Sequence, residues 1–375
     1  FANIIAVPWM SFTAIPLCLL SVVVMPFSEP LASFFLELSI ISLDFIWQWL
    51  DFLAHQQTLF IDVSHETLMI IIVICGLSFI SYFLSLPKKY ATALIVISLL
   101  TFMYYTNSHQ ANNDWQVSVL DVGQGLSVVI ERNGKVILYD TGASYPSGFN
   151  LAESVVFPYL QYRGIETIDQ LILSHTDNDH AGGLTFIEEQ VVSGKIVVNE
   201  MKFNDKDNEH QKYPRKKSCK KGDSFTWQGL TLNVLWPEVI QEKENDNSCV
   251  INVSDGKYNV LLTGDISRKV EKILVSDSTI ADELKANIII APHHGSKTSS
   301  SSRFIEAVSP DTVIFSAGYL NRWHMPNKAV LKRYQEFNVT PYSTAEQGMV
   351  VIKIAEYGLE IETYREHIKP YWFAN

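Results

Sequence analysis

The sequence predicts an α-helical membrane segment followed by a soluble α/β domain with four layers, helices outside and two sheets inside. Charge divides the chain, because 27 of the 29 basic and 34 of the 40 acidic residues follow residue 105. The first part therefore has the composition of membrane helices, and the second that of a soluble domain with a net charge of −7. In that second part, short apolar strands fall into two groups with helices interspersed, which favours two packed sheets over one parallel sheet.

These features predict four consecutive regions. Residues 1–105 form membrane and interfacial helices, 106–114 a linker, 115–362 the α/β domain, and 363–375 a C-terminal tail. The apolar segments repeat and lack the basic start and cleavage site of a signal peptide, and the chain opens on Phe1. We therefore expect the C-terminal piece of a longer, multi-pass membrane protein.

Several apolar segments are long enough to cross a bilayer. Residues 4–27 and 67–86 are clear spans, and 91–105 is a shorter one with Tyr104 and Tyr105 at its interfacial end. Residues 31–53 are ambiguous, because Glu37 and Asp44 share one helical face. This pattern fits an interfacial amphipathic helix, the preferred interpretation, or a span whose acids face a polar pathway.

The orientation depends on two lysines. Lys88 and Lys89 are the only basic residues before residue 106, and the positive-inside rule places their loop in the cytoplasm. The next span then places the α/β domain on the outer side of the inner membrane, in the periplasm. A disulfide between Cys219 and Cys249 would suit that compartment, but sequence alone leaves open whether the two sulfurs meet.

The α/β domain is expected to begin with a strand over 116–120 and a hairpin of 126–130 and 135–139 around Asn133-Gly134. Further strands are predicted at 169–173, 230–235, 249–253, 259–262, 288–290, 312–315 and 349–354. Helices are predicted near 151–162, 267–274, 301–308 and 328–337.

One loop carries most of the predicted chemistry. The run His175-Thr-Asp177-Asn-Asp179-His180-Ala-Gly-Gly places four metal-capable side chains within six residues, directly after a strand. A loop allows imidazoles and carboxylates to converge, and the glycines allow close backbone approach. The alternative is a polar turn in which an aspartate caps a helix. Two histidines beside two aspartates make this alternative the weaker interpretation.

Two further strand ends supply candidate ligands. Gly264-Asp265 ends one strand, and Asp265 is predicted to bridge two cations rather than to form only an Asx turn. His293 and His294 end another strand, where one would bind metal and the other would support it or contact substrate. Which of the two binds metal stays open, and a structural histidine pair is the alternative.

A later loop and a basic segment are weaker candidates. His324 is predicted to donate a proton to the leaving group or to be a surface residue, and Arg322 to hold a phosphate. The serines at 299–302 are interpreted as a flexible loop rather than as nucleophiles. Basic residues between 202 and 221 form a DNA-guiding patch or a solvated loop. The candidates kept from that segment are Lys216, Lys217, Lys220 and Lys221.

Together these motifs resemble the metallo-β-lactamase fold and, more narrowly, the ComEC family of inner-membrane proteins for DNA uptake in natural competence. The resemblance rests on Asp121-Val-Gly-Gln-Gly, Tyr-Asp140-Thr-Gly, the His175 run, Leu-Leu-Thr-Gly-Asp265, Pro-His-His-Gly-Ser and Asn-Arg-x-His-x-Pro, all after membrane segments. It implies that Asp140 orients the site. It also implies metal ligation by His175, Asp177, Asp179, His180, Asp265 and the His293-His294 pair.

The sequence departs from the fold's general pattern in two places. Asp177 replaces a histidine, and no convincing third-motif histidine precedes Asp265, since His210 lies in a charged loop. The site is thus richer in oxygen ligands, which favours Mn²⁺ or Mg²⁺ relative to Zn²⁺. We expect two divalent ions, Mn²⁺ or Zn²⁺ with Mg²⁺ as a further option, and Asp179 to orient the attacking water.

The resemblance implies that this domain hydrolyses one DNA strand while the membrane part passes the other strand. It also implies other competence proteins as partners, and it is compatible with oligomerisation. Two alternatives remain open. The domain is a non-catalytic metal-binding module that gates the channel, or a membrane-tethered phosphodiesterase for another substrate. A net negative charge is unfavourable for DNA binding, although bound cations offset it locally.

Overall fold

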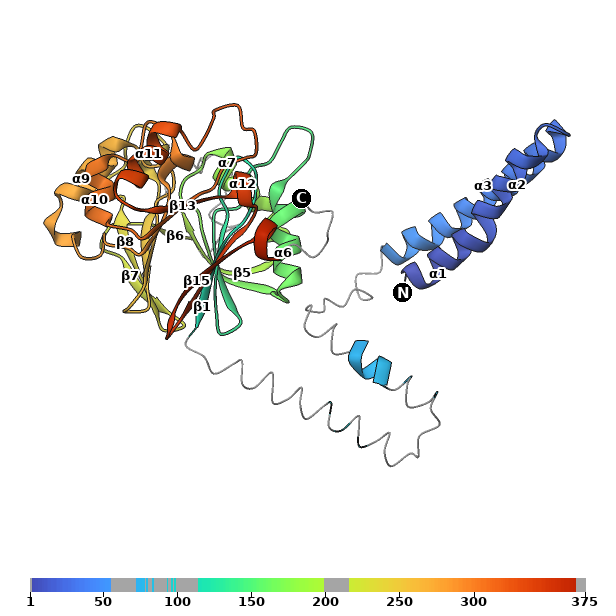
Figure 1. Cartoon of the computed structure of the whole chain (residues 1–375), viewed down its shortest axis with the longest axis horizontal. Coiled ribbons are helices and arrows are strands. Elements are labelled where there is room, and N and C mark those ends of the chain that lie inside the picture. Colours follow the sequence, from blue (N-terminus) through green and yellow to red (C-terminus); the bar gives the residue numbers. More distant parts are fainter. Residues whose placement is uncertain are drawn as a thin grey trace. The chain divides into compact units, whose positions relative to one another are not determined.

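The computed structural model describes residues 2–54, 114–198 and 216–368, together with 72–77 and the single residues 79, 83, 93, 96 and 98. The chain divides into two compact units, Phe1–Val63 and Ser64–Asn375, which are treated separately (Figure 1). The loop with Lys88 and Lys89 and His210 lie outside the described residues, as do most of the predicted spans 67–86 and 91–105 and most of the linker.

The N-terminal unit is a pair of long apolar helices. The first comprises α1 (Ala2–Trp9), a π-helical stretch (Met10–Ala14) and α2 (Ile15–Val24), and the second is α3 (Glu29–Ala54). Two stretches are long and apolar enough to cross a membrane, Asn3–Val24 and Glu29–Leu53. The π-helical stretch lies between Pro8 and Pro16, where missing backbone donors locally loosen the helix.

Small and hydroxyl side chains hold the two helices together. Ser21 Oγ donates to the Ala32 carbonyl at 2.8 Å, and Ser39 Oγ donates to the Ala14 carbonyl at 2.9 Å. Both alanines are buried, which lets the backbones approach closely, as in membrane helix pairs. This lengthwise packing of α3 on the first helix is compatible with both alternatives for residues 31–53, the interfacial helix and the span.

The described residues of the second unit form two sheets (Figure 1). In spatial order the first comprises β15 (Gly358–Thr363), β14 (Val350–Ala355), β1 (Trp115–Val119), β2 (Val128–Arg132), β3 (Lys135–Tyr139), β4 (Thr167–Ile172), β5 (Val192–Val198) and β6 (Lys216–Ser218). The second comprises β13 (Thr340–Ser343), β12 (Thr312–Phe315), β11 (Ile288–Ile290), β10 (Asn259–Leu262), β9 (Val250–Ser254), β8 (Leu230–Trp236) and β7 (Ser224–Trp227). Both sheets are mixed, with parallel pairs β3–β4 and β4–β5 in the first and β10–β11 and β11–β12 in the second.

Three hydrophobic cores create the predicted four layers. One lies between the sheets, and the others lie under the helices that cover each outer face. The first sheet is covered by α6 (Phe157–Tyr162) and α8 (Leu184–Gln190), and the second by α9 (Arg268–Ser276), α10 (Ser302–Val308) and α11 (Lys328–Glu336). Successive residues of β2 enter opposite cores, because a strand alternates its faces and this sheet is buried on both.

The predicted elements form within one or two residues of their expected bounds, and the turn Asn133-Gly134 has the positive φ angles of a type I′ hairpin. The helix predicted over 151–162 is instead a π-helical stretch, Ala152–Val156, followed by α6. The sequence did not predict β5, β6, β7, β13, β15, α7 (Asn178–Ala181), α8 or α12 (Thr344–Gln347).

The domain also continues beyond the end predicted for it. Thr363 is fully buried, and a π-helical turn follows at Tyr364–Ile368. Arg365 of that turn donates from Nη1 to the carbonyls of Ala345 and Glu346. At least residues 363–368 of the predicted tail are therefore part of the folded domain.

Candidate metal centre

The polar motifs lie at the carboxyl ends of strands in both sheets. Asp140 follows β3, His175 comes three residues after β4, Asp265 three residues after β10, and His293 three residues after β11. The parallel pairs β3–β4 and β10–β11 therefore present their carboxyl ends, and the residues after them, at one edge of the sandwich. Helix α7, which carries Asp179 and His180, lies at this edge (Figure 1).

Four side chains form the centre of the site. One ligand-type atom from each of Asp179, His180, Asp265 and His294 lies within 4.8 Å of the others. His180 Nε2 is 3.1 Å from Asp265 Oδ1, and His294 Nε2 is 3.4 Å from Asp179 Oδ2 and 3.6 Å from Asp265 Oδ2. Asp179 and His180 follow a strand of the first sheet, and Asp265 and His294 follow strands of the second. Both sheets are therefore needed to assemble the four side chains.

The chemistry of these atoms fits a divalent cation. His175 Nε2, His180 Nε2, Asp265 Oδ1 and His294 Nε2 are buried, and none makes a hydrogen bond of regular geometry. Their nearest polar neighbours, at 3.1–3.6 Å, belong to the same group of histidines and aspartates. Leaving one such group unpaired costs about 1–3 kcal/mol, so four at one place are expensive unless something binds them. Imidazole nitrogens and carboxylate oxygens at this spacing are ligands for Zn²⁺ or Mn²⁺.

His294 is fixed in the tautomer that a metal ligand needs. Its Nδ1 lies 2.9 Å from the Ser316 carbonyl, which can only accept, so Nδ1 carries the proton and Nε2 presents its lone pair. His293 is 28% exposed, and its Nε2 lies 3.6 Å from the same Asp265 oxygen that His294 faces. The question left open by the sequence is thus resolved in part, because His294 completes the buried cluster while both histidines reach Asp265.

Burial and opposite charges shift the pKa values of the central pair. Burial disfavours the charged imidazole of His180, but the carboxylates of Asp265 and Asp140 outweigh it and raise its pKa well above 6.5. Burial likewise opposes the charged form of Asp265, but charge on His294 and His180 holds its pKa well below the usual value. The pocket therefore stabilises the Asp265 carboxylate next to a positive charge. A bound cation would supply that charge in place of the proton on the imidazoles.

His175 and Asp177 extend the cluster. His175 is fully buried, and its Nε2 lies 3.6 Å from Asp177 Oδ2, whose side chain is 44% exposed. The neighbouring imidazole of His175 lowers the pKa of Asp177 against its partial burial. Asp265 presents Oδ1 to His180 and Oδ2 to His293 and His294. Both oxygens of this carboxylate therefore face histidines, and its predicted bridging of two cations remains a prediction.

Asp140 holds the site from behind. It is fully buried and accepts three hydrogen bonds, from the Ser174 backbone N–H at 2.6 Å, from Ser174 Oγ at 2.7 Å and from His180 Nδ1 at 2.7 Å. The bond to Nδ1 turns His180 Nε2 toward Asp265. The orienting role predicted for Asp140 therefore has a structural basis.

Replacing Asp140 with asparagine should weaken metal binding by about 10- to 100-fold, the usual cost of losing a group that orients a ligand. The amide keeps the side-chain volume but carries one oxygen and less negative charge, so it cannot accept all three bonds. Calorimetric titration with Mn²⁺ measures the effect. An affinity equal to the wild type would show that His180 is held by other contacts.

Glycines allow the motifs to approach one another. A Cβ on Gly125, whose φ is +146°, would lie 2.4 Å from the Asp179 carbonyl oxygen. A Cβ on Gly264, whose φ is +53°, would lie 2.7 Å from Ser248 Oγ. Both positions have backbone conformations that favour glycine. The crowding at Gly264, directly before Asp265, therefore requires a residue without a side chain there.

Alanine at Gly125 should displace the Asp179 backbone and reduce Mn²⁺ affinity by about tenfold or more. Gly134 provides a matched control, since its φ is also positive, at +70°, but a Cβ there meets open space. Gly134→Ala should therefore cost only about 1 kcal/mol of stability and leave metal binding unchanged. Equal metal affinities for the two variants would argue against steric control by Gly125.

Three supporting residues were not predicted. Ser248 Oγ accepts from the Asp265 backbone N–H at 2.8 Å, and Asn245 Nδ2 lies 3.4 Å from Asp265 Oδ2. Ser174 Oγ bonds Asp140 and lies 2.9 Å from His175 Nδ1. The position of Ser174 directly before His175 could have indicated its role from the sequence. Nothing in the sequence around Ser248 or Asn245 indicates theirs.

The serine-rich segment is not the flexible loop expected from sequence. Ser299 and Ser300 are fully buried. Ser299 Oγ donates to the Pro292 carbonyl at 2.8 Å, and the Ser300 and Ser301 backbone N–H groups donate to the Glu271 carboxylate. The segment is therefore a framework that supports the turn carrying His293 and His294, both of which have positive φ.

His324 and Arg322 lie outside the cluster. His324 is exposed, and among the described residues no hydrogen bond or ion pair joins its side chain to the metal ligands. The Arg322 guanidinium lies over the Trp323 ring, 4.2 Å from its centroid. The catalytic role of His324 and the phosphate contact of Arg322 remain predictions.

The basic segment is partly ordered and partly neutralised. Lys216 and Lys217 belong to the edge strand β6 rather than to a loop. Lys217 pairs with Asp223 at 3.1 Å, and Lys221 pairs with Asp277 and Glu238. Lys220 is exposed. These ion pairs reduce the charge available to DNA, so the predicted DNA contact of this segment stays a prediction with less support.

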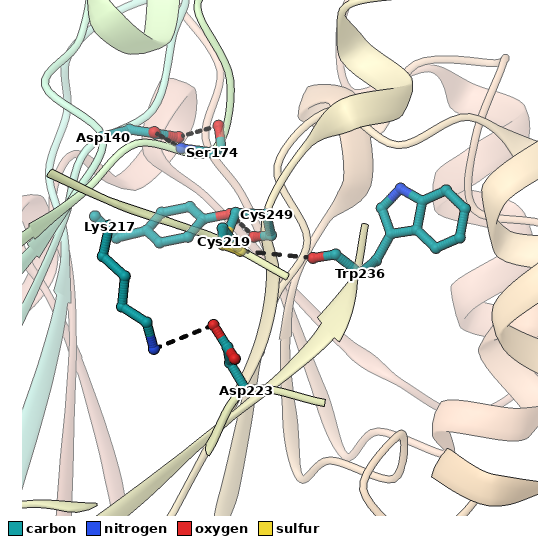
Figure 2. Close-up of a disulfide and its surroundings, with 8 residues drawn as sticks. Asp140, Ser174, Lys217, Cys219, Asp223, Trp236 and Cys249 are labelled. Atoms are coloured by element: carbon teal, nitrogen blue, oxygen red, sulfur yellow. Dashed lines mark hydrogen bonds and ion pairs between the residues drawn. A yellow bond between two sulfur atoms is a disulfide. The ribbon is translucent and has the colours of Figure 1, made fainter. Parts of the chain in front are cut away.

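A disulfide joins Cys219 to Cys249 (Figure 2). Cys219 follows edge strand β6 of the first sheet and Cys249 precedes β9 of the second, so the bond links the two sheets. The Cys249 N–H donates to the Ser174 carbonyl at 2.8 Å, and its carbonyl accepts from the Tyr139 hydroxyl at 2.7 Å. The two sulfurs therefore meet, which the sequence had left open. The disulfide lies next to Ser174, the residue that donates to Asp140 (Figure 2).

Known proteins match both parts of the chain. The model of the metallo-beta-lactamase superfamily matches residues 120–319, and the Competence protein model matches residues 1–107. Recombination protein 2 of Haemophilus influenzae is 39% identical over 279 residues, covering 74% of this chain and 34% of that protein. Among solved structures, the metallo-beta-lactamase fold protein YhfI of Bacillus subtilis is 15% identical, with 64% of this chain and 100% of that one covered and a TM-score of 0.44.

Two relatives match nearly the whole chain. Competence protein ComA of Neisseria gonorrhoeae is 29% identical over 374 residues, covering 99% of this chain and 50% of that protein. ComE operon protein 3 of Bacillus subtilis is 26% identical over 375 residues, covering 93% of this chain and 47% of that protein. The chain spans about a third to a half of the length of these curated relatives. It belongs to the metallo-β-lactamase superfamily and joins that domain to a competence-protein domain, as in the ComEC family that its motifs resemble.

Proposed function

We propose that the chain is part of an inner-membrane DNA-uptake protein whose metal-dependent domain hydrolyses phosphodiester bonds and degrades the strand that is not transported. The observation that carries this proposal is the buried, unpartnered ligand set of His175, His180, Asp265 and His294. The family context supplies the substrate class, because the relatives named above are competence and recombination proteins.

The residues suit this chemistry in defined ways. Divalent cations held here would activate water and neutralise charge on the phosphoryl oxygens. Asp179, His180, Asp265 and His294 would hold one ion, and His175 and Asp177 with Asp265 a second. Asp179 is 36% exposed while Asp265 is 4% exposed, so Asp179 is the carboxylate of the central cluster best placed to orient a water molecule at the rim.

The ligand types favour a phosphodiester over a β-lactam substrate. Asp177 stands where the general pattern has a histidine, and three carboxylates face the histidines of the cluster. Oxygen-rich sites favour harder ions such as Mn²⁺, which are common partners of phosphate oxygens. We therefore infer a Mn²⁺-dependent nuclease rather than a β-lactamase.

The location proposed for the domain is the periplasmic side of the inner membrane. Two apolar helices long enough to span a bilayer precede it. The Cys219–Cys249 disulfide supports an oxidising compartment, because such bonds rarely persist in a reducing cytosol. A periplasm-active reporter fused after residue 375 should be active, and a silent reporter would contradict this orientation.

The nuclease proposal is tested with the full chain in lipid nanodiscs and a DNA strand labelled at either end. After metal removal with a chelator, cleavage should be lost, and Mn²⁺ should restore it. His294→Ala should prevent restoration, while the exposed His324→Ala tests the predicted leaving-group role separately. Absence of cleavage with Mn²⁺, Mg²⁺ or Zn²⁺ in a chain that binds these ions would contradict the proposal.

One observation favours a second candidate. No third-motif histidine is found among the described residues, where Ser248 and Asn245 lie beside Asp265 instead. A site with fewer ligands fits a non-catalytic module that binds metal and gates the channel. Fewer than one bound cation per domain, together with DNA uptake that survives His294→Ala, would favour this gating function.

A further inference from the structure

Two loops, residues 144–150 and 318–327, carry exposed aromatic side chains. Both loops extend above α7 in Figure 1, at the metal edge. The first covers residues 144–150, where the Tyr145 N–H donates to the Phe149 carbonyl at 2.8 Å and the two rings are 5.8 Å apart. Ser144 bonds Asn178 twice, from its hydroxyl at 3.1 Å and through its carbonyl at 2.9 Å. Since Asn178 lies between Asp177 and Asp179, this loop is attached directly to the metal motif.

The second loop covers residues 318–327 and is attached to the other histidine motif. The Asn327 N–H donates to the Gly295 carbonyl at 2.9 Å, directly after His294. Asn321 closes the loop through bonds from Nδ2 to the carbonyls of Gly318 and Met325, and it accepts from the Met325 N–H. The loop thus holds its side chains in place before any ligand binds.

Four aromatic rings on these loops form what we call the aromatic rim. Its members are Tyr145, Phe149, Tyr319 and Trp323, which are 45%, 52%, 69% and 48% exposed. Leaving large rings in water is unfavourable, and both loops that carry them are hydrogen-bonded to the metal motifs, which indicates a binding role. The Arg322 guanidinium lies over the Trp323 ring and adds a positive charge for an anionic chain.

We propose that the aromatic rim stacks the bases of single-stranded nucleic acid while a phosphodiester between them lies at the metal cluster. The proposal rests on the nuclease function proposed above and specifies its substrate. Aromatic rings beside cations are the usual surface for single strands, because every base offers a flat face and every linkage a negative charge. The positive guanidinium of Arg322 complements that charge.

The rim also discriminates between strand forms. In a duplex the faces of the bases are covered by their neighbours, so stacking on protein rings requires an unpaired strand. A lipid bilayer seated on the same rings would cover the metal edge and block access of a polymer to it. The geometry therefore favours a single strand over either a duplex or a membrane as the occupant.

The test measures binding without cleavage. The full chain in nanodiscs, kept in a chelator, is titrated into labelled oligothymidylate of about 16 nucleotides, within the range of single-strand sites. Trp323→Ala and Phe149→Ala should each weaken binding by about tenfold, since one base stack contributes about 1–3 kcal/mol. Trp323→Phe keeps a ring and should restore most of the affinity.

A matched control is Tyr357→Ala. Tyr357 is 94% exposed on the turn between β14 and β15, beside the start of β1, whereas Asp121 to Gly125 of the metal edge follow the end of β1. This variant should bind like the wild type. An oligonucleotide of equal charge with abasic positions should bind the wild type and Trp323→Ala equally, because it has no bases to stack.

Three results would overturn the proposal. Wild-type affinity in both alanine variants would show that the rings do not contact the strand. Equal losses on the abasic oligonucleotide would show phosphate contact instead of stacking, and protection of residues 318–327 from hydrogen exchange by lipid alone would assign the rim to the membrane. Because binding is measured without metal, the two proposals can fail separately. A chain that binds DNA through the aromatic rim but never cleaves it would contradict the proposed nuclease function and support the proposed role of the rim.

Discussion

Asp265→Ala is expected to abolish metal-dependent cleavage, with a loss of about 10³-fold or more. The carboxylate is 4% exposed and presents one oxygen to His180 and the other to His293 and His294, so we propose it as the ligand that these histidines share. Losing a single charge-stabilising contact in an active site costs about 10²- to 10³-fold. Losing a shared ligand should cost at least as much, because the ions themselves are then released.

The measurement combines bound Mn²⁺ per chain with the cleavage rate at saturating Mn²⁺. Asp282→Ala is the matched control, since its side chain is 96% exposed and, within the described part of the chain, pairs only with Lys285. The control should bind and cleave like the wild type. Full metal content in Asp265→Ala would mean that the remaining ligands suffice and that Asp265 does not bridge the ions.

Loss of the Cys219–Cys249 bond is expected to destabilise the α/β domain by about 3–4 kcal/mol, the usual value for a loop of this length. For a domain of this size, that corresponds to a fall of about 10 °C in melting temperature. Because Cys249 bonds Ser174, which in turn bonds Asp140, the same loss should weaken Mn²⁺ binding.

The comparison uses a Cys219→Ser, Cys249→Ser double variant, and thermal unfolding is followed by scanning fluorimetry. Cys18→Ser is the control, because Cys18 is a free, exposed cysteine in α2. Only the double variant should melt earlier and be insensitive to reductant. Equal melting of the wild type with and without reductant would show that the cross-link contributes little to the folded state.

The sequence predicts the principal candidate ligands because they are adjacent along the chain. His175 to His180 are consecutive after one strand, and Asp265 and the His293-His294 pair each end another, so strand direction alone brings them to one edge. The four layers follow equally from the grouping of apolar strands. Short edge strands such as β6, with two lysines in three residues, carry too little apolar pattern to be recognised.

Other features depend on distances that a sequence does not contain. Ser248 supports Asp265 through a single hydroxyl 17 residues away, and nothing in its neighbours marks it. Whether Cys219 meets Cys249 depends on how the two sheets stack. The role of His294 depends on a carbonyl at Ser316, and the shared reach of His293 depends on positive φ angles at both histidines.

The central claim is that the cluster of Asp179, His180, Asp265 and His294 binds a catalytic divalent ion. The most direct measurement is anomalous diffraction at the manganese edge from crystals of the chain grown with Mn²⁺. The account predicts a strong peak within bonding distance of all four residues, about 2.0–2.3 Å from each ligand atom. Crystals with Mn²⁺ bound elsewhere and no peak among these four side chains would contradict it.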